Sequence, residues 1–135
     1  MWLVASAACL ATPVHGDVVK AGPFVGHIAP GYDVVGGRFR LHVGPWRVPG
    51  GLTQKIHWFV GKRYPVDGPL VVTGTRLDRS PRTFRQTFNA AGQSSPSTTY
   101  VFPSTIAPPA PGCWRLSFRS GRVAGSLVAL VSDGR

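Results

Sequence analysis

Residues 111–131 constrain the fold of this chain most, because their pattern predicts two β-strands joined by a tight turn. Between Trp114 and Arg119 large apolar side chains alternate with polar ones, which gives a strand one apolar and one solvated face. Ser120 and Gly121 supply the turn. Residues 126–131 are mostly apolar, so we expect the returning strand to be largely buried. The chain therefore ends in a β-hairpin that closes a β-rich domain.

The composition agrees with a single all-β domain. The 135 residues are enough for one domain with a real core, and 17 Gly and 13 Pro interrupt any long helix. In addition to the closing hairpin, alternating or apolar runs predict short strands at residues 24–28, 38–43, 54–60, 70–77, 83–89 and 100–102. Seven to eight short antiparallel strands at this spacing predict an immunoglobulin-like β-sandwich.

Two tryptophans are the candidates for the centre of the core. Trp58 lies in the middle of an early strand, where an immunoglobulin-like core often has its central side chain. Trp114 lies on the apolar face of the closing hairpin. We expect both indoles to be buried and close together, each from a different strand. Within residues 70–77, Gly74 is expected to form a bulge or bend.

The first 16 residues have the pattern of a secretory signal peptide. An apolar run from Trp2 to Ala11 is followed by Pro13 and by the small residue Gly16. We therefore expect cleavage after Gly16, a single mature domain at residues 17–135, and a secreted or cell-envelope protein. The run is too short to span a bilayer, so no transmembrane span is expected in the mature chain. The alternative is that this run is the first β-strand of the domain.

The two cysteines are interpreted through this cleavage. Cys9 and Cys113 can pair in an exported protein that keeps both residues. Cleavage after Gly16 instead leaves Cys113 alone, as an inert thiol that points away from the Trp114 face. Cys9 also follows Ser6-Ala7-Ala8, which loosely matches a lipoprotein processing site, but such sites usually have Leu at the position of the serine. Simple secretion is therefore favoured over lipidation of Cys9.

The charge is strongly basic and comes mostly from arginine. Lys and Arg number 15 against 5 acidic residues, which gives a net charge of +10. Such a surface attracts nucleic acid, acidic cell-wall polymers or anionic lipid, although charges scattered along many strands also simply keep a protein soluble. The candidate anion-binding residues gather in one turn and on one late strand: Arg76, Arg79, Arg82, Arg85, Arg115 and Arg119. The candidate exposed aromatic residues are Trp46, Phe59 and Tyr64.

Motifs for catalysis or for a cofactor are missing from the sequence. The chain has no Glu, and most of its Asp residues lie in predicted turns, where Asp normally accepts hydrogen bonds from backbone N–H groups. No Gly-x-Ser-x-Gly sequence or phosphate-binding glycine loop is present. His27, His42 and His57 are weak candidates for a metal site, since no His-x-His or Cys-x-x-Cys spacing supports them. We therefore expect neither an enzyme nor a cofactor.

Several segments together resemble a group of uncharacterised exported bacterial proteins. These segments are residues 55–59, 68–78, 102–104, 112–116 and 123–131. The most distinctive piece is the Gly-Cys-Trp sequence at residues 112–114, which opens the last hairpin in that group. The resemblance covers about half of the chain. It implies export and an immunoglobulin-like sandwich, but no catalytic residue, because the group has no established activity.

Three functions remain open at this point. The first is a non-enzymatic interaction or structural module of the cell envelope, for which the sequence identifies no partner and leaves an envelope protein or an anionic polymer as the options. The second is a binder of an anionic polymer or carbohydrate, which predicts a continuous basic patch with an aromatic residue beside it. The third is a small metal-binding sandwich, which predicts histidine nitrogens within about 4 Å of one another.

Overall fold

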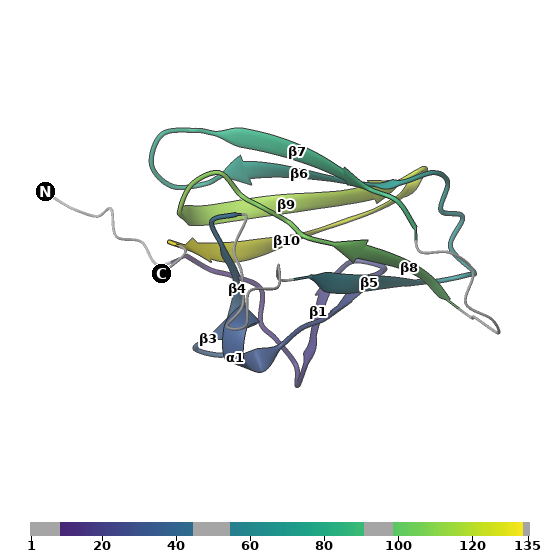
Figure 1. Ribbon diagram of the computed structural model, residues 1–135, viewed down its shortest axis with the longest axis horizontal. Coiled ribbons are helices and arrows are strands. Elements are labelled where there is room, and N and C mark those ends of the chain that lie inside the picture. The colour runs from purple at the N-terminus through teal and green to yellow at the C-terminus, as the bar shows by residue number, and fades with distance from the viewer. Residues whose placement is uncertain (1–8, 45–54, 91–98, 134–135) are drawn as a thin grey trace, which may run out of the picture.

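The computed structural model describes residues 9–44, 55–90 and 99–133, and Figure 1 shows them as strands packed in two layers. The elements in chain order are β1 (Val18–Ala21), β2 (Phe24–His27), α1 (Pro30–Asp33), β3 (Val34–Val35), β4 (Arg38–His42), β5 (Ile56–Gly61), β6 (Leu70–Arg76), β7 (Thr83–Phe88), β8 (Thr99–Ser104), β9 (Gly112–Ser120) and β10 (Val123–Ser132). No helix in these ranges has the length and apolar character needed to cross a membrane.

The strands form two sheets, which confirms the predicted all-β sandwich. One sheet has the strand order β1-β2-β5-β8 and the other has the order β3-β4-β10-β9-β6-β7. Neighbouring strands are antiparallel except β4 and β10, which run parallel. The described residues contain ten strands rather than the predicted seven to eight. The difference arises in residues 18–35, where one edge strand was expected and β1, β2 and β3 are found.

The core lies between the sheets and follows the predicted alternation. Trp58 and Trp114 are both fully buried, as expected. The Trp58 indole packs on Phe118 at a ring-centroid distance of 4.5 Å, which joins the two sheets. Trp114 packs on Phe84 at 5.4 Å. Among the described residues no ring contact joins the two indoles, so the expected closeness of the two tryptophans stays a prediction.

Gly74 has a packing role and not the predicted bulge. It pairs in regular register with Leu116 on one side and Phe84 on the other. A Cβ atom at this position would collide with the Phe84 ring. The absent side chain therefore lets Phe84 lie across β6 and reach Trp114.

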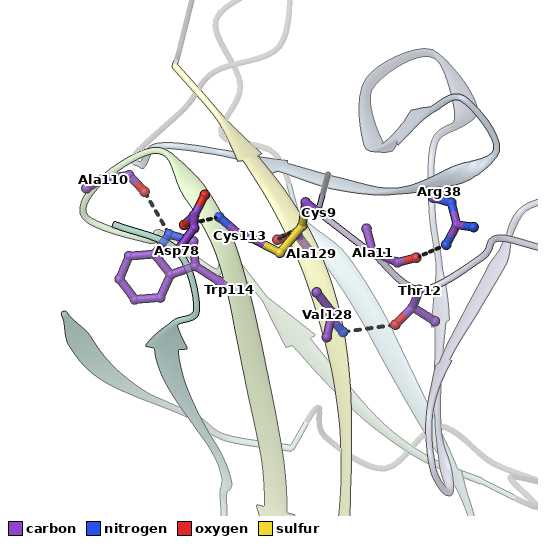
Figure 2. Close-up of a disulfide and its surroundings, with 10 residues drawn as sticks. All are labelled: Cys9, Ala11, Thr12, Arg38, Asp78, Ala110, Cys113, Trp114, Val128 and Ala129. Carbon is purple, nitrogen blue, oxygen red and sulfur yellow. Dashed lines mark hydrogen bonds between the residues drawn. A yellow bond between two sulfur atoms is a disulfide. The ribbon is translucent and has the colours of Figure 1, made fainter. Parts of the chain in front are cut away.

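Residues 11–14 lie in the seam between β4 and β10. The backbone N–H of Thr12 donates to the Val128 carbonyl at 2.8 Å, and the Val128 N–H donates to Thr12 Oγ1 at 2.9 Å (Figure 2). On the other side, the Phe39 N–H donates to the Thr12 carbonyl at 2.9 Å. The direct register of β4 with β10 covers only the pairs from Arg40–Leu130 onward. Before that point β4 and β10 are not paired with each other, and Thr12 lies between them and bonds to the backbone of both.

The residues of this seam lie before the cleavage site that was expected after Gly16. Ala11 is buried, and His15 forms an isolated bridge with Val18 just beyond the expected cleavage point. Cleavage after Gly16 stays a prediction, but the hydrogen bonds of residues 11–15 match the alternative, in which this segment begins the folded domain.

Cys113 is not the lone thiol expected after cleavage. It forms a disulfide with Cys9, with 5.4 Å between the two Cα atoms (Figure 2). The strand alternation was predicted correctly, because the Cys113 side chain leaves β9 on the face opposite Trp114. The lone thiol was expected only for a chain cleaved after Gly16, because that cleavage removes Cys9, and this expectation stays a prediction. In the full chain the disulfide fastens the start of the described fold to the last hairpin.

Candidate anion-binding surfaces

The six arginines proposed as an anion site separate into three groups. Arg85, Arg115 and Arg119 are exposed and point outward from the six-stranded sheet. The alternate residues are buried in β9 and half-buried in β7, so the outward direction follows from the period of two. These three residues are the part of the predicted patch that the fold brings onto one face.

Arg76 has a structural role instead. Its Nε and one terminal nitrogen donate to the Ser80 carbonyl at 3.0 and 2.8 Å, and the other donates to the Pro111 carbonyl at 3.2 Å. The guanidinium carbon also lies 5.9 Å from the Trp114 ring centroid. Because its donors are directed at backbone carbonyls, Arg76 holds the β6–β7 turn against the start of β9.

Arg79 and Arg82 lie in the β6–β7 turn and outside the sheet face. Both are exposed, and Arg79 has a positive φ of 59°. The Arg82 carbonyl accepts a hydrogen bond from the Arg76 backbone N–H at 2.9 Å, which closes the turn. Neither residue belongs to the row of side chains that contains Arg85.

Small hydroxyl side chains separate the three outward arginines. Arg85 lies opposite Thr73 on β6, and Thr73 lies opposite Ser117 on β9. Ser126 on β10 continues the same row beside Ser117. Adjacent strands are about 4.8 Å apart, so this row spans about 14 Å. It forms a strip of hydroxyl groups with one guanidinium group at its end.

Arg115 and Arg119 lie on either side of this strip. They are two residues before and after Ser117 on β9, so about 13 Å of strand separates them. A shallow trough of about 540 Å³ lies between the strands here, with Arg85, Arg119 and the strip along it. We call the surface made by Arg85, Arg115, Arg119, Thr73, Ser117 and Ser126 the arginine face.

Carboxylates are absent from the strands that carry the arginine face. The chain has only five acidic residues, all Asp, and none lies in β6, β7, β9 or β10. Asp33 and Asp78 accept hydrogen bonds from the backbone N–H groups of Ala29 and Cys113, both at 2.8 Å. These two confirm the backbone role expected for Asp in turns. The positive potential of the arginine face therefore has no neighbouring acid on its own strands to cancel it.

The candidate aromatic residues do not lie on the arginine face. Phe59 is half-buried on the outer side of the four-stranded sheet, where its ring contacts His27 at 4.8 Å. Tyr64 is half-buried after β5 and lies under Arg63, whose guanidinium carbon is 5.0 Å from the ring centroid. Trp46 lies outside the described residues.

The three candidate histidines divide between the two sheets. His27 and His57 are exposed cross-strand partners in β2 and β5, whereas His42 lies in β4 of the other sheet. Burial and the nearby Arg40 lower the pKa of His42. Within the described ranges, His, Cys, Asp and Glu form no group of three or more that could hold a metal ion.

Sequence reasoning found the arginines but not their hydroxyl neighbours. The pairing of Thr73 with Ser117 depends on the order of β6 and β9 in the sheet, which no local pattern reveals. The available signal was the outward position of Thr and Ser on strands that also carry Arg. Comparison of the chain with protein-family models, curated proteins and solved structures gave no match.

Proposed function

We propose that this protein is an exported, non-enzymatic interaction module that binds an anionic polysaccharide through the arginine face. The observation that carries the proposal is the convergence of Arg85, Arg115 and Arg119 on one exposed sheet face whose strands contain no acid. Several guanidinium groups on one face neutralise several anionic groups together, which is the source of affinity for a charged polymer.

The side chains between the arginines favour a sugar polymer over a nucleic acid. Thr73, Ser117 and Ser126 offer hydroxyl groups that both donate and accept hydrogen bonds, as sugar hydroxyls do. Binding of single-stranded nucleic acid usually relies on aromatic rings that stack on the bases. Among the described residues, the outward side chains that line the trough are apolar aliphatic, hydroxyl or arginine side chains, and none of them is aromatic.

Two observations support export. The Cys9–Cys113 disulfide is the kind of bond that persists in oxidising compartments and is rare in the cytosol. The Gly-Cys-Trp hairpin also resembles the corresponding element of exported bacterial proteins. An exported protein meets acidic glycans of the envelope or of other cells, so location and ligand are consistent with each other.

Heparin provides the test, as an anionic polysaccharide of defined charge. The face variant carries Arg85→Ser, Arg115→Ser and Arg119→Ser. We expect its affinity for heparin at low salt to fall about 10-fold or more. The slope of log affinity against log salt should flatten by about 2 to 3, because each lost anionic contact changes this slope by about 1. Titration at several salt concentrations measures both quantities.

A control variant removes the same charge elsewhere. It carries Lys55→Ser, Arg79→Asn and Arg82→Ser, all at exposed positions away from the arginine face. Asn suits position 79 because it tolerates the positive φ found there. The control should retain most of the affinity and the wild-type slope. Equal losses in both variants would show that only net charge matters, and tighter binding of double-stranded DNA than of heparin would overturn the choice of polymer.

A further inference from the structure

A second basic hollow lies on the other side of the molecule. It is an open groove of about 680 Å³ between the β1–β2 hairpin and the residues that follow β5. Its cationic side chains come from both walls: Lys20 from β1, and Lys62 and Arg63 from the start of the β5–β6 connection. The described residues that line it include no acidic one. We call this hollow the tyrosine groove, after Tyr64 in its wall.

Two of the three cations of the tyrosine groove, Lys62 and Arg63, lie over tyrosine rings. Arg63 donates from a terminal nitrogen to the Tyr64 hydroxyl at 3.2 Å, and its guanidinium group lies over the same ring. The Lys62 ammonium lies 5.7 Å from the Tyr100 ring centroid. The Tyr64 backbone N–H donates to the Gly61 carbonyl at 3.0 Å, which fixes the turn itself. Positioned cations lose less conformational entropy when they bind an anion than freely rotating ones do.

The tyrosine groove and the arginine face open in opposite directions. Lys20 points outward from the four-stranded sheet, because its neighbours Val19 and Ala21 are buried in the core. The arginine face points outward from the six-stranded sheet, and the two sheets pack with their inner faces together. A straight chain lying flat on the arginine face therefore does not also lie in the groove, and one chain occupies both only if it bends around the β1–β2 turn.

A close backbone contact nevertheless joins the two surfaces. Gly22, in the wall of the tyrosine groove, has its backbone against Gly125 of β10, which borders the trough on the arginine face. A Cβ atom built on Gly22 would lie 3.0 Å from the Gly125 Cα atom, so the β1–β2 turn and β10 are in close backbone contact. This contact fixes the distance between the two binding surfaces.

We infer that the tyrosine groove is a second site for an anionic segment of the same class of polysaccharide, so that one molecule joins two polymer chains. This inference rests on the proposed function, since the arginine face must hold the first chain. The groove adds Lys20, Lys62 and Arg63 as contacts for sulfate or carboxylate groups. A protein with two anion sites on opposite faces links polymer chains, which is a structural role in a matrix or envelope.

A capture experiment tests the bridge. The protein is bound to immobilised heparin, washed, and exposed to a short fluorescent heparin oligosaccharide. Wild type should retain the labelled oligosaccharide on the surface. The groove variant carries Lys20→Ser, Lys62→Ser and Arg63→Ser. It should still bind the immobilised polymer, but the amount of label that it retains should fall by about 10-fold or more. All three residues are exposed, so the variant should fold normally.

The controls separate this inference from the proposed function. The control variant defined above removes the same charge and should capture label as wild type does. Light scattering of the free protein must give the mass of a monomer, because a dimer would capture label through two arginine faces. Capture by the groove variant equal to wild type, or no capture by wild type, would overturn the bridge. Undiminished binding of the face variant to immobilised heparin would instead overturn the proposed function.

Discussion

The two halves of β10 have the same backbone geometry but opposite surroundings. In the first half, residues 123–126, the outward side chains Ala124 and Ser126 are exposed and border the arginine face. In the second half, residues 127–132, the outward side chains Val128 and Leu130 are half-buried. The inward residues of the second half, such as Ala129, are fully buried. Residues 127–131 are thus apolar on both faces of the strand, whereas the first half is not.

The cover over the second half explains this difference. Thr12 is hydrogen-bonded to Val128, and Cys9 is tied by its disulfide to Cys113, which is the register partner of Leu130 (Figure 2). The first half has β9 as its only paired neighbour strand among the described residues. An uninterrupted apolar run in a strand of this sandwich therefore marks the place where a second segment covers the sheet. The small outward residues Ala124 and Ser126 mark the part of the strand whose outer side stays exposed.

Removal of residues 1–16 tests the cover and should have the largest effect. The truncation deletes the disulfide, whose loss alone typically costs about 2–5 kcal/mol, and the partners of the Val128 and Phe39 backbone groups. It also exposes Val128 and Leu130. We expect the free energy of unfolding, measured in urea, to fall by about 4 kcal/mol or more.

A variant of the full chain separates the contribution of the disulfide from the rest of this loss of stability. Cys9→Ser with Cys113→Ser removes only the disulfide and should cost about 2–4 kcal/mol, less than the truncation. Heparin affinity of this double variant should equal that of wild type, because neither cysteine belongs to the arginine face. A truncated protein as stable as the full chain would show that the domain begins at Asp17, as the signal-peptide pattern predicts.

The first half of β10 offers a smaller test at Gly125. An added Cβ at this position would collide with the Ala21 carbonyl of the neighbouring hairpin. Gly125→Ala should therefore lower the free energy of unfolding by about 1–3 kcal/mol, as overpacking of a close contact does. Ser126→Ala is the matched control: it points to solvent and should change stability by no more than about 0.5 kcal/mol. Equal urea midpoints for the two variants would mean that the hairpin is not held against β10.

The alternation along the strands was sufficient to predict the sandwich. Phe39 and Leu41, and likewise Ile56 and Val60, were placed on the inner face by the period of two, and all four are buried. The alternation could not show which strands are neighbours, so the row from Arg85 to Ser117 was not foreseen. Strand order is decided by contacts between residues far apart in sequence, which leave no local period.

The sequence left two interpretations of the N-terminal segment open, because both share one local pattern. A short apolar run followed by Pro13 fits both a signal peptide and a first strand. The evidence that separates them lies at the other end of the chain, in the apolar outward residues Val128 and Leu130, which need a cover. Similarly, the tyrosine groove combines Lys20 with Lys62 and Arg63, which are about forty residues apart and meet only through the pairing of β2 with β5.

The smallest expected effect concerns pH at the second half of β10. His42 is the register partner of Ser132, and burial together with the nearby Arg40 lowers its pKa below the ordinary value of 6.5. The folded protein therefore binds a proton at His42 less readily than the unfolded chain does. Stability is unaffected by this group well above pH 6.5, and it falls as the pH drops through 6.5 toward the lowered pKa of the folded state.

Urea midpoints at several pH values between about 8 and 5 measure this effect. His42→Gln should reduce the loss of stability on acidification, whereas the same substitution at the exposed His57 of the other sheet should leave that loss as it is in wild type. The arginine face contains no histidine, so the His42 substitution should not alter the pH dependence of heparin binding. Identical stability profiles for His42→Gln and wild type would mean that the end of β10 beside β4 is open to water. In that case the contrast between the two halves of the strand would be limited to the residues that Thr12 and Cys9 cover directly.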